Sequence, residues 1–339
     1  MKSAHRIALS LLISVVVFSI FAVIAFSGFF AYLETEFYNR RVTDSIKMDL
    51  EKLKYSIEEY HETYFNRFSA IIRQEFIARA FLPNLSREDL FLINNTFGTL
   101  QSEYPGILGI RLIDERGSIH FSTFDRDIRL REDFRIAYNR LQDVEPIIGY
   151  SDLLTSEAGN ILLYFDGANR RILYILKIYD SLNRFRGSAV FSLSLQDLKQ
   201  HLLQRGVLEL GKEISLVQER GCLFNISQTG PGFLEDTLLM QWVQRTEDSI
   251  FEPIPVSYQD RDFYLFSVYS GKTGFIGYMV SGQQFALDDS LKILLLVSLF
   301  LTCFLVTFLL FSVRQDKVLV LSQRIKRFQI NFIKEYLEN

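Results

Sequence analysis

The chain has 339 residues, and its 37 Lys and Arg against 40 Asp and Glu give a formal net charge of −3. This balance, without a basic patch of interleaved aromatic residues, argues against nucleic acid as a partner. The sequence has only two cysteines, and Cys303 lies inside an apolar run whereas Cys222 does not. A disulfide framework is therefore excluded, and Cys222 is expected to be a small buried residue.

Two long uncharged runs lie near the ends of the chain: 27 residues at 7–33 and 21 residues at 293–313. As helices they would be about 40 and 31 Å long, against a hydrocarbon core of about 30 Å. The first run is too long for the apolar core of a signal peptide, which favours an uncleaved anchor over a cleaved signal. We therefore predict transmembrane helices at 7–33 and 293–313.

The charges beside these runs predict how the chain is oriented. Lys and Arg lie outside both runs, in 1–6 and 314–339, whereas acidic residues flank their inner ends. The positive-inside rule then places both termini in the cytoplasm, and the central domain in the periplasm or outside the cell. A two-span protein of the bacterial cytoplasmic (inner) membrane is expected. The tail at 314–339 has the pattern of a basic amphipathic helix, which either lies on membrane lipid, docks an unknown cytoplasmic partner, or begins a longer cytoplasmic region.

A long amphipathic helix is predicted over 34–82, because Phe29 to Leu82 contain neither Gly nor Pro. This helix can continue without a break from the first span. Its apolar stripe falls mostly at three- and four-residue steps: Val42, Ile46, Leu50, Leu53, Ile57, Tyr60, Tyr64 and Ile71. The stripe packs on its own domain, pairs with a second copy in a homodimer, or does both.

A second helix is predicted from Ser86 to about Tyr104. Pro83 ends the preceding helix, and Ser86 followed by Asp89 forms an N-cap with an acid three residues later. Two hairpins are then predicted from a repeated pattern, because IRLIDERG at 110–117 and ISLVQERG at 214–221 share five positions. In both copies apolar residues alternate up to a polar turn.

The elements after each hairpin follow a similar order, which indicates a duplicated fold unit. After the first we expect a short helix at 132–141, an irregular stretch at 143–159, strands at 161–165, 172–179 and 187–193, and a helix at 195–203. After the second we expect a helix at 233–244 and strands at 254–258, 263–269 and 275–280.

Three segments carry a resemblance to a known family: Ile110 to Thr123, Arg131 to Ala137 and Ile178 to Leu193. They resemble the strand–turn–strand, Arg-aromatic and strand-Asp-turn-strand motifs of the double Cache (PAS-like) extracytoplasmic sensor domains of bacterial membrane receptors. The resemblance implies an α+β membrane protein. Its two transmembrane helices flank the long helix and two PAS-like antiparallel-sheet modules, one membrane-distal (83–205) and one membrane-proximal (206–289).

A ligand site is expected in the distal module. The resemblance points to Arg131, Phe134 and Asp180, and Asp133, where many amino-acid-binding members have Trp, argues against an α-amino acid as the ligand. Placed charges among aromatic walls, as small polar ligands require, extend the candidate set to Tyr138, Tyr150, Asp152, Tyr164, Lys177 and Tyr179. The alternative is that the tyrosines lie at the edge of the core and that Arg131 and Asp180 form a salt bridge.

Motifs for catalysis and metal binding are not found. The sequence Gly271-Lys-Thr273 lacks the earlier glycine of a P-loop, because Phe266 occupies that position. The four histidines show no metal-ligand spacing, and no G-x-S-x-G occurs. We therefore expect no catalytic residue, no metal and no cofactor, and predict that the chain is not an enzyme.

Two functions remain. The first is a membrane-anchored receptor or sensor subunit that binds a small extracytoplasmic ligand in the distal module and passes a conformational signal across the membrane. The second is a non-sensing membrane-anchored scaffold or assembly protein that recruits a partner through its cytoplasmic tail. A cavity with convergent charge favours the receptor, and a filled module favours the scaffold.

Overall fold

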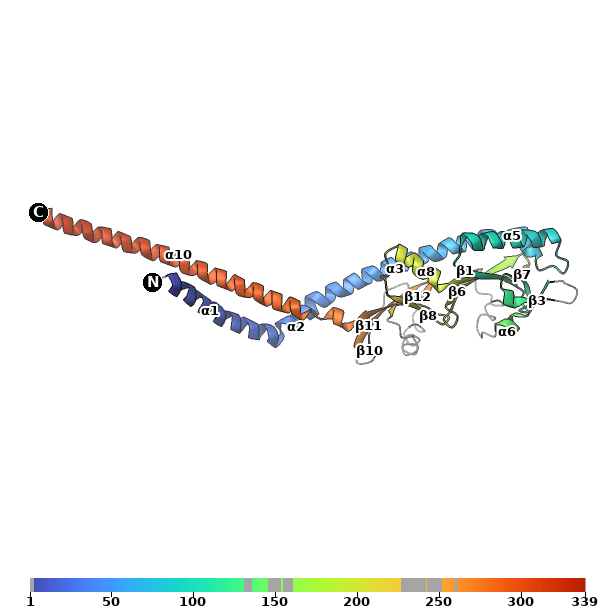
Figure 1. Ribbon diagram of the computed structural model, residues 1–339, viewed down its shortest axis with the longest axis horizontal. Helices are drawn as coiled ribbons and strands as arrows, with labels where there is room; N and C mark the ends of the chain where they lie inside the picture. Colours follow the sequence, from blue (N-terminus) through green and yellow to red (C-terminus); the bar gives the residue numbers. More distant parts are fainter. Residues whose placement is uncertain are drawn as a thin grey trace. The chain divides into compact units, whose positions relative to one another are not determined.

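The computed structural model describes residues 3–130, 136–145, 154, 161–226, 242, 252–258 and 261–338. The chain divides into two compact units. A helical unit contains Met1–Asp44 and Gln283–Asn339, and a sheet-containing unit contains Ser45–Gly282. Figure 1 shows the elements of both units, coloured along the chain.

The helical unit pairs α1 (Ser3–Ile24) with α10 (Asp289–Glu338). The rings of Phe18 and Phe300 meet edge to face at 5.3 Å, and the Ser14 and Thr307 hydroxyls are 2.7 Å apart. Stretches within Leu11–Ile72 and Gly282–Leu310 are long and apolar enough to cross a membrane, judged by length and composition. The two apolar helices of the prediction are therefore present, and their topology stays a prediction.

The first span does not run into the long helix as a regular α-helix. A π-helical turn at Ala25–Phe29 is followed by α2 (Phe30–Leu33) and a second π-helical turn at Glu34–Tyr38. Gly28 has φ of 157°, outside the helical region, and glycine adopts this conformation without a steric penalty. The expectation of an unbroken helix is corrected at this point.

The long helix α3 (Asn39–Ile72) buries most of the predicted apolar stripe. Its buried residues include Ile46, Leu50, Leu53, Ile57, Tyr60, Tyr64, Phe68 and Ile71. The rings of Phe68 and Phe191 stack at 3.9 Å between centroids, and Phe191 lies on a strand of the same unit. The stripe therefore packs on its own domain. Pairing with a second copy stays a prediction.

The long helix is shorter than expected, since α3 ends at Ile72 and a separate helix α4 spans Glu75–Arg79. Gln74 between them has extended φ and ψ, although no Gly or Pro is nearby. The turn places Ile77 in the core, where it is fully buried. Tertiary packing thus overrides the helix propensity of this segment.

Helix α5 spans Arg87–Glu103 and begins as predicted, because the Ser86 hydroxyl accepts a hydrogen bond of 2.9 Å from the Asp89 amide. The first sheet follows, with strand order β2-β1-β7-β6-β5. All of its neighbouring strands are antiparallel. Its strands are β1 (Ile107–Ile113), β2 (Ile119–Ser122), β5 (Ile161–Asp166), β6 (Arg171–Tyr179) and β7 (Phe185–Ser194).

The two faces of the first sheet have different partners. Helices α3 and α5 lie along one side of it, and α6 (Leu141–Val144) and β3 (Ile128–Leu130) lie on the other (Figure 1). The helix-covered face is aromatic, as in the pair Phe97 and Phe121 at 5.4 Å. The opposite face has its own apolar cluster, which includes Leu173, Ile175 and Val190.

The prediction of a short helix at 132–141 is wrong for the residues that the structure describes. Residues Ile136–Tyr138 form strand β4, which pairs antiparallel with β3, and the helical turn α6 begins only at Leu141. A ladder with β3 satisfies the backbone groups here, and β-branched Ile136 suits a strand. Residues 132–135 of this prediction, and all of the helix expected at 233–244 except Trp242, lie outside the described residues.

Helix α8 (Leu195–Gln204) joins the first sheet to the second. The second sheet has strand order β10-β11-β12-β9-β8, and the structure confirms every strand predicted for it. Its strands are β8 (Glu213–Val217), β9 (Gly221–Ile226), β10 (Ile254–Tyr258), β11 (Arg261–Ser270) and β12 (Gly274–Ser281).

The two modules differ in how the hairpin joins its sheet. In the first, the leading strand β1 pairs antiparallel with β7, whereas in the second the trailing strand β9 pairs parallel with β12. Strand β8 therefore lies at an edge, and its alternating burial fits that position. The repeated sequence predicted both hairpins correctly, but the sheets are not copies of one topology.

The two glycines of the repeat accordingly serve different purposes. Gly117 has φ of 75° in the first turn, and its nearest contact for an added Cβ is Leu141, at 3.9 Å. Gly221 instead meets β12 so closely that a Cβ would overlap the Phe275 carbonyl oxygen. The first glycine is required by the turn, and the second by the approach of two backbones.

A buried histidine lies between α3 and the first sheet. His61 is 1% exposed, and its Nδ1 is 2.5 Å from the hydroxyl of Tyr174. Burial lowers the pKa of His61 to about 3. Below a pH of about 6.5 His61 is protonated in the unfolded chain but stays neutral in the folded chain. Because the unfolded state then binds more protons, the free energy of unfolding falls as the pH falls from 6.5 towards 3.

We expect the full chain in detergent to lose roughly 4–8 °C in melting midpoint between pH 6.5 and 5, because His61 alone contributes up to about 1.4 kcal/mol per pH unit. The fluorescence of Trp242, the single tryptophan, reports the transition. We expect His61→Leu to remove most of this loss. The remaining part is assigned to His201, because burial lowers its pKa as well. The control His120→Asn changes a more exposed histidine and keeps the loss. An unchanged pH dependence in His61→Leu contradicts the assignment.

Candidate functional site

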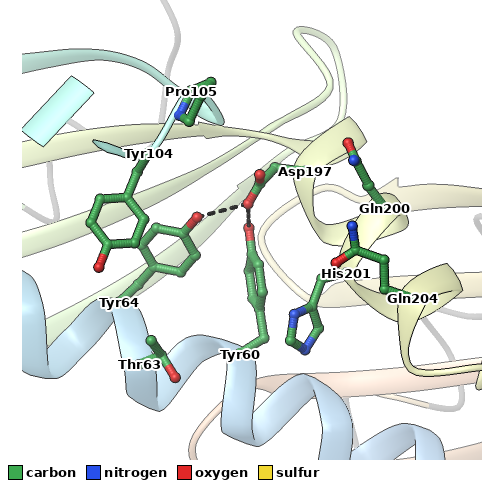
Figure 2. Close-up of a pocket in the computed structure, with 9 residues that line it drawn as sticks. All are labelled: Tyr60, Thr63, Tyr64, Tyr104, Pro105, Asp197, Gln200, His201 and Gln204. Atoms are coloured by element: carbon green, nitrogen blue, oxygen red, sulfur yellow. Dashed lines mark hydrogen bonds between the residues drawn. The ribbon is translucent and has the colours of Figure 1, made fainter. Parts of the chain in front are cut away.

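A pocket of about 350 Å³ lies between α3, the turn after α5 and α8 (Figure 2). Ligand pockets for small molecules begin at about this volume. Its lining residues are Tyr60, Thr63, Tyr64, Tyr104, Pro105, Asp197, Gln200, His201 and Gln204. All of them belong to the sheet-containing unit, so the pocket lies within one compact body.

Asp197 is the centre of the polar part of this pocket (Figure 2). The hydroxyls of Tyr60 and Tyr64 both donate to its Oδ2 atom, each at 2.8 Å. The two tyrosines lie four residues apart on α3, so their side chains share one face of that helix. Among the described residues, no hydrogen bond reaches the other carboxylate oxygen, Oδ1.

The position of Asp197 follows from the start of α8. Ser194 caps this helix, because its hydroxyl accepts a hydrogen bond of 3.1 Å from the Gln196 amide. Asp197 then falls in the first turn, where the helix dipole favours a negative charge. Its carboxyl group lies against Gly106, where an added Cβ would overlap it. The Pro105-Gly106 break after α5 therefore also makes room for this carboxylate.

The charges around the pocket leave its lining anionic. Burial is the largest cause that raises the pKa of both Tyr60 and Tyr64, and the charge of Asp197 raises both further. Both phenols therefore stay protonated and act as donors. Burial lowers the pKa of His201, which is therefore neutral at pH 7. Asp197 supplies the formal charge of the lining.

Two arginines beside the pocket are paired with residues outside the lining. Arg67 lies 2.5 Å from Glu103, and Arg205 pairs with Glu59. The Arg67 guanidinium also lies over the ring of Tyr104, 5.8 Å from its centroid. Neither arginine is bonded to Asp197, so the carboxylate remains available to a bound molecule.

Four of the residues predicted for the site lie outside the described part of the chain: Arg131, Phe134, Tyr150 and Asp152. The other five are on or beside the first sheet: Tyr138 on β4, Tyr164 on β5, Lys177 and Tyr179 on β6, and Asp180 directly after β6. None of these five lines the Asp197 pocket. Their role in binding stays a prediction.

Asp180 organises a turn in the structure. Its Oδ1 accepts from the amides of Leu182 and Arg184, each at 2.9 Å, and its Oδ2 lies 2.7 Å from Nη2 of Arg186. The backbone amide of Arg184 is the largest cause that holds the pKa of this carboxyl well below its usual range. These bonds account for Asp180 structurally. The predicted partner Arg131 lies outside the described residues.

Tyr164 connects the first sheet to the second hairpin. Its hydroxyl accepts from Gln218 Nε2 at 2.6 Å and lies 3.4 Å from Glu219 Oε1. The Glu219 amide also donates to the Phe165 carbonyl oxygen at 3.0 Å. The polar turn of the repeated pattern is thus a docking point between the two sheets.

A buried ionic network on the face opposite α3 was missed by the sequence analysis. Arg111 on β1 is 1% exposed, and its Nε and Nη2 bind Asp127 at 2.6 and 3.0 Å. Glu145 binds Arg111 and lies 2.5 Å from Arg171. The signal was a lone arginine inside the apolar strand at 107–113.

Metal binding receives no support from the described residues. Within them, no group of three or more His, Cys, Asp or Glu side chains is placed to hold a metal ion. Cys222 is buried, and burial raises its thiol pKa, so it carries little thiolate at neutral pH.

Comparison with known proteins places this fold in a family. The family model TP_0593_N, described as an N-terminal domain, matches residues 38–284, which is most of the chain. The chain belongs to the TP_0593_N family. Its match covers all of the sheet-containing unit, including every lining residue of the Asp197 pocket, and extends into the helical unit at 38–44 and 283–284.

One relative of this TP_0593_N chain is an uncharacterized protein of Treponema pallidum (strain Nichols). The two are 25% identical over 316 residues, which cover 91% of this chain and 46% of the relative. The chain thus spans less than half the length of that protein.

Solved structures with a similar outline include the sensor domain of the histidine kinase DctB of V. cholerae. It is 13% identical with a TM-score of 0.44, over 72% of this chain and 98% of that one. The ligand-binding domain of Mlp24 with asparagine is 13% identical with a TM-score of 0.36, over 72% and 94% of the two chains.

Proposed function

We propose that this chain is the ligand-binding and membrane-anchoring part of a two-span receptor of the bacterial inner membrane. The sheet-containing unit binds a small polar molecule outside the cytoplasm, and the chain carries out no catalysis itself. The observation that carries the proposal is the pocket at Asp197, where one carboxylate converges with three tyrosines. A cavity of this size favours the receptor function over the scaffold function, because a scaffold is expected to have a filled module.

The contacts of α3 support a route for the signal. This helix supplies Tyr60 and Tyr64 to the pocket, and its Glu58 accepts a hydrogen bond of 2.7 Å from Ser270 in the second sheet. A ligand that prefers one arrangement of α3 against α8 therefore also favours one arrangement of the second sheet. Such a ligand shifts the equilibrium only by its difference in affinity for the two arrangements.

The test is a thermal-shift screen of the full chain in detergent against organic acids, amines, amino acids, sugars and nucleobases. A compound at a hundred times its dissociation constant adds about 2.7 kcal/mol, which raises the melting midpoint of a domain of this size by roughly 5–10 °C. We expect one chemical class to produce such a shift and Asp197→Asn to abolish it.

Asp180→Ala provides the comparison with the predicted distal site, since Asp180 does not line the pocket. If Asp180→Ala abolishes the shift in a folded protein and Asp197→Asn does not, the ligand binds at the distal face and the pocket assignment is wrong. If no compound shifts the folded wild-type chain, the scaffold function replaces the receptor.

A further inference from the structure

We propose that the Asp197 pocket selects a small organic cation, an amine or a quaternary ammonium compound. The proposal rests on the receptor function above and names the ligand class of the same pocket. Its basis is the combination of one unneutralised carboxylate, three tyrosine rings and two amide side chains in a single lining.

The sign of the charge is the first argument. The described lining contains one carboxylate and no Lys or Arg. Its histidine ring lies 5.2 Å from Tyr60, in a place where burial keeps it neutral. An anionic ligand would meet Asp197 without a compensating charge, and a neutral one could gain only a hydrogen bond from it, whereas a cation also gains the attraction between opposite charges.

The aromatic walls are the second argument. The ring centroids of Tyr60 and Tyr64 are 4.9 Å apart, and those of Tyr64 and Tyr104 are 5.7 Å apart. Tyrosine faces attract cations, and quaternary ammonium ligands are held by such groups of rings. The ring of Tyr104 already takes part in such a contact, because the Arg67 guanidinium lies 5.8 Å from its centroid, so Tyr60 and Tyr64 are the rings left for a ligand.

The arrangement of the hydrogen bonds is the third argument. Both phenol protons go to Oδ2 of Asp197, so Tyr60 and Tyr64 present no further hydroxyl proton to a ligand. What remains at Asp197 itself is the charge and Oδ1 of the carboxylate, together with the phenol oxygens of Tyr60 and Tyr64. These groups accept from donors or attract positive charge, which suits an ammonium group better than a carboxylate. The amides of Gln200 and Gln204 and the hydroxyl of Tyr104 can both donate and accept, so they do not select the sign of the charge.

The experiment compares molecules of one shape and different charge on the full chain in detergent. Choline chloride is the cationic probe, 3,3-dimethylbutan-1-ol is its neutral isostere with carbon in place of nitrogen, and methylammonium chloride is a smaller cation. Sodium acetate and sodium chloride control for anions and ionic strength. Titration calorimetry is expected to show saturable binding of choline or methylammonium at least tenfold tighter than that of the neutral isostere.

Three variants locate the effect. Asp197→Asn keeps an oxygen for the two phenol hydrogen bonds and removes the charge, so we expect at least a tenfold loss of cation affinity. Tyr104→Leu removes one wall and is expected to weaken binding several-fold. Asp49→Asn removes a negative charge from α3 that pairs with exposed Lys52 outside the lining, and it should leave the affinity unchanged.

The outcomes separate the two proposals. Equal binding of the neutral isostere, or a cation affinity unaffected by Asp197→Asn, overturns the cation assignment. If the cations fail but an acid, sugar or nucleobase binds and is lost in Asp197→Asn, the pocket and receptor function stand and only the ligand class is wrong. If no compound binds at all, both proposals fail.

Discussion

Asp127→Ala is expected to lower the free energy of unfolding by about 3–5 kcal/mol. Asp127 is fully buried and accepts two hydrogen bonds from Arg111, which is itself 1% exposed. Removing the carboxylate leaves a buried guanidinium that still pairs with Glu145 but has lost both of its hydrogen bonds to Asp127. Denaturant unfolding of the full chain in detergent, followed by circular dichroism, measures the loss.

Two further variants identify the cause. The double change Arg111→Met with Asp127→Leu removes both charges and is expected to recover most of the stability, because apolar residues of similar volume replace a buried pair at little cost. Asp89→Ala breaks a pair with Arg79, whose side chain is 41% exposed, and should cost much less than Asp127→Ala. A loss of 1 kcal/mol or less in Asp127→Ala shows that the network is not buried as described.

Gly221→Ala is expected to destabilise the chain by about 3 kcal/mol or more. The added methyl group would overlap the Phe275 carbonyl oxygen, and relief requires β9 and β12 to move apart. Those strands pair in parallel register from Gly221 opposite Phe275 to Phe224 opposite Tyr278, so the displacement affects the centre of the second sheet. The melting midpoint of the full chain, read from Trp242 fluorescence, measures the effect.

Gly117→Ala is the matched control from the other copy of the repeat. Its cost comes from a positive φ of 75° and not from a clash, and is expected to be about 1–2 kcal/mol. Equal costs at the two glycines contradict the parallel pairing and support two sheets of identical topology.

Local patterns predicted the elements well. Alternating apolar residues around E-R-G predicted both hairpins, and the Ser86 and Asp89 pair predicted the start of α5, because these signals act between residues close in sequence. The same patterns gave no information on which strand of the second hairpin pairs with β12. That choice depends on the contact between Gly221 and Phe275, more than fifty residues apart.

The pocket was hidden for a similar reason. Tyr60 and Tyr64 were predicted only as members of the apolar stripe of the long helix, and Asp197 is an ordinary first-turn residue of its helix. Their meeting depends on α3 and α8 packing side by side, over more than a hundred residues of sequence separation. A tyrosine pair four residues apart on a buried face was the available signal, since phenols in a core require a polar partner.

The most direct test of the receptor account is hydrogen exchange of the full chain in detergent, with and without the strongest compound of the thermal-shift screen. We predict slower amide exchange in peptides covering 60–64 and 197–204, with Asp197→Asn showing no such change. Slower exchange confined to the first sheet near Lys177 and Asp180, with no change at 60–64 or 197–204, would contradict the pocket as the site of binding.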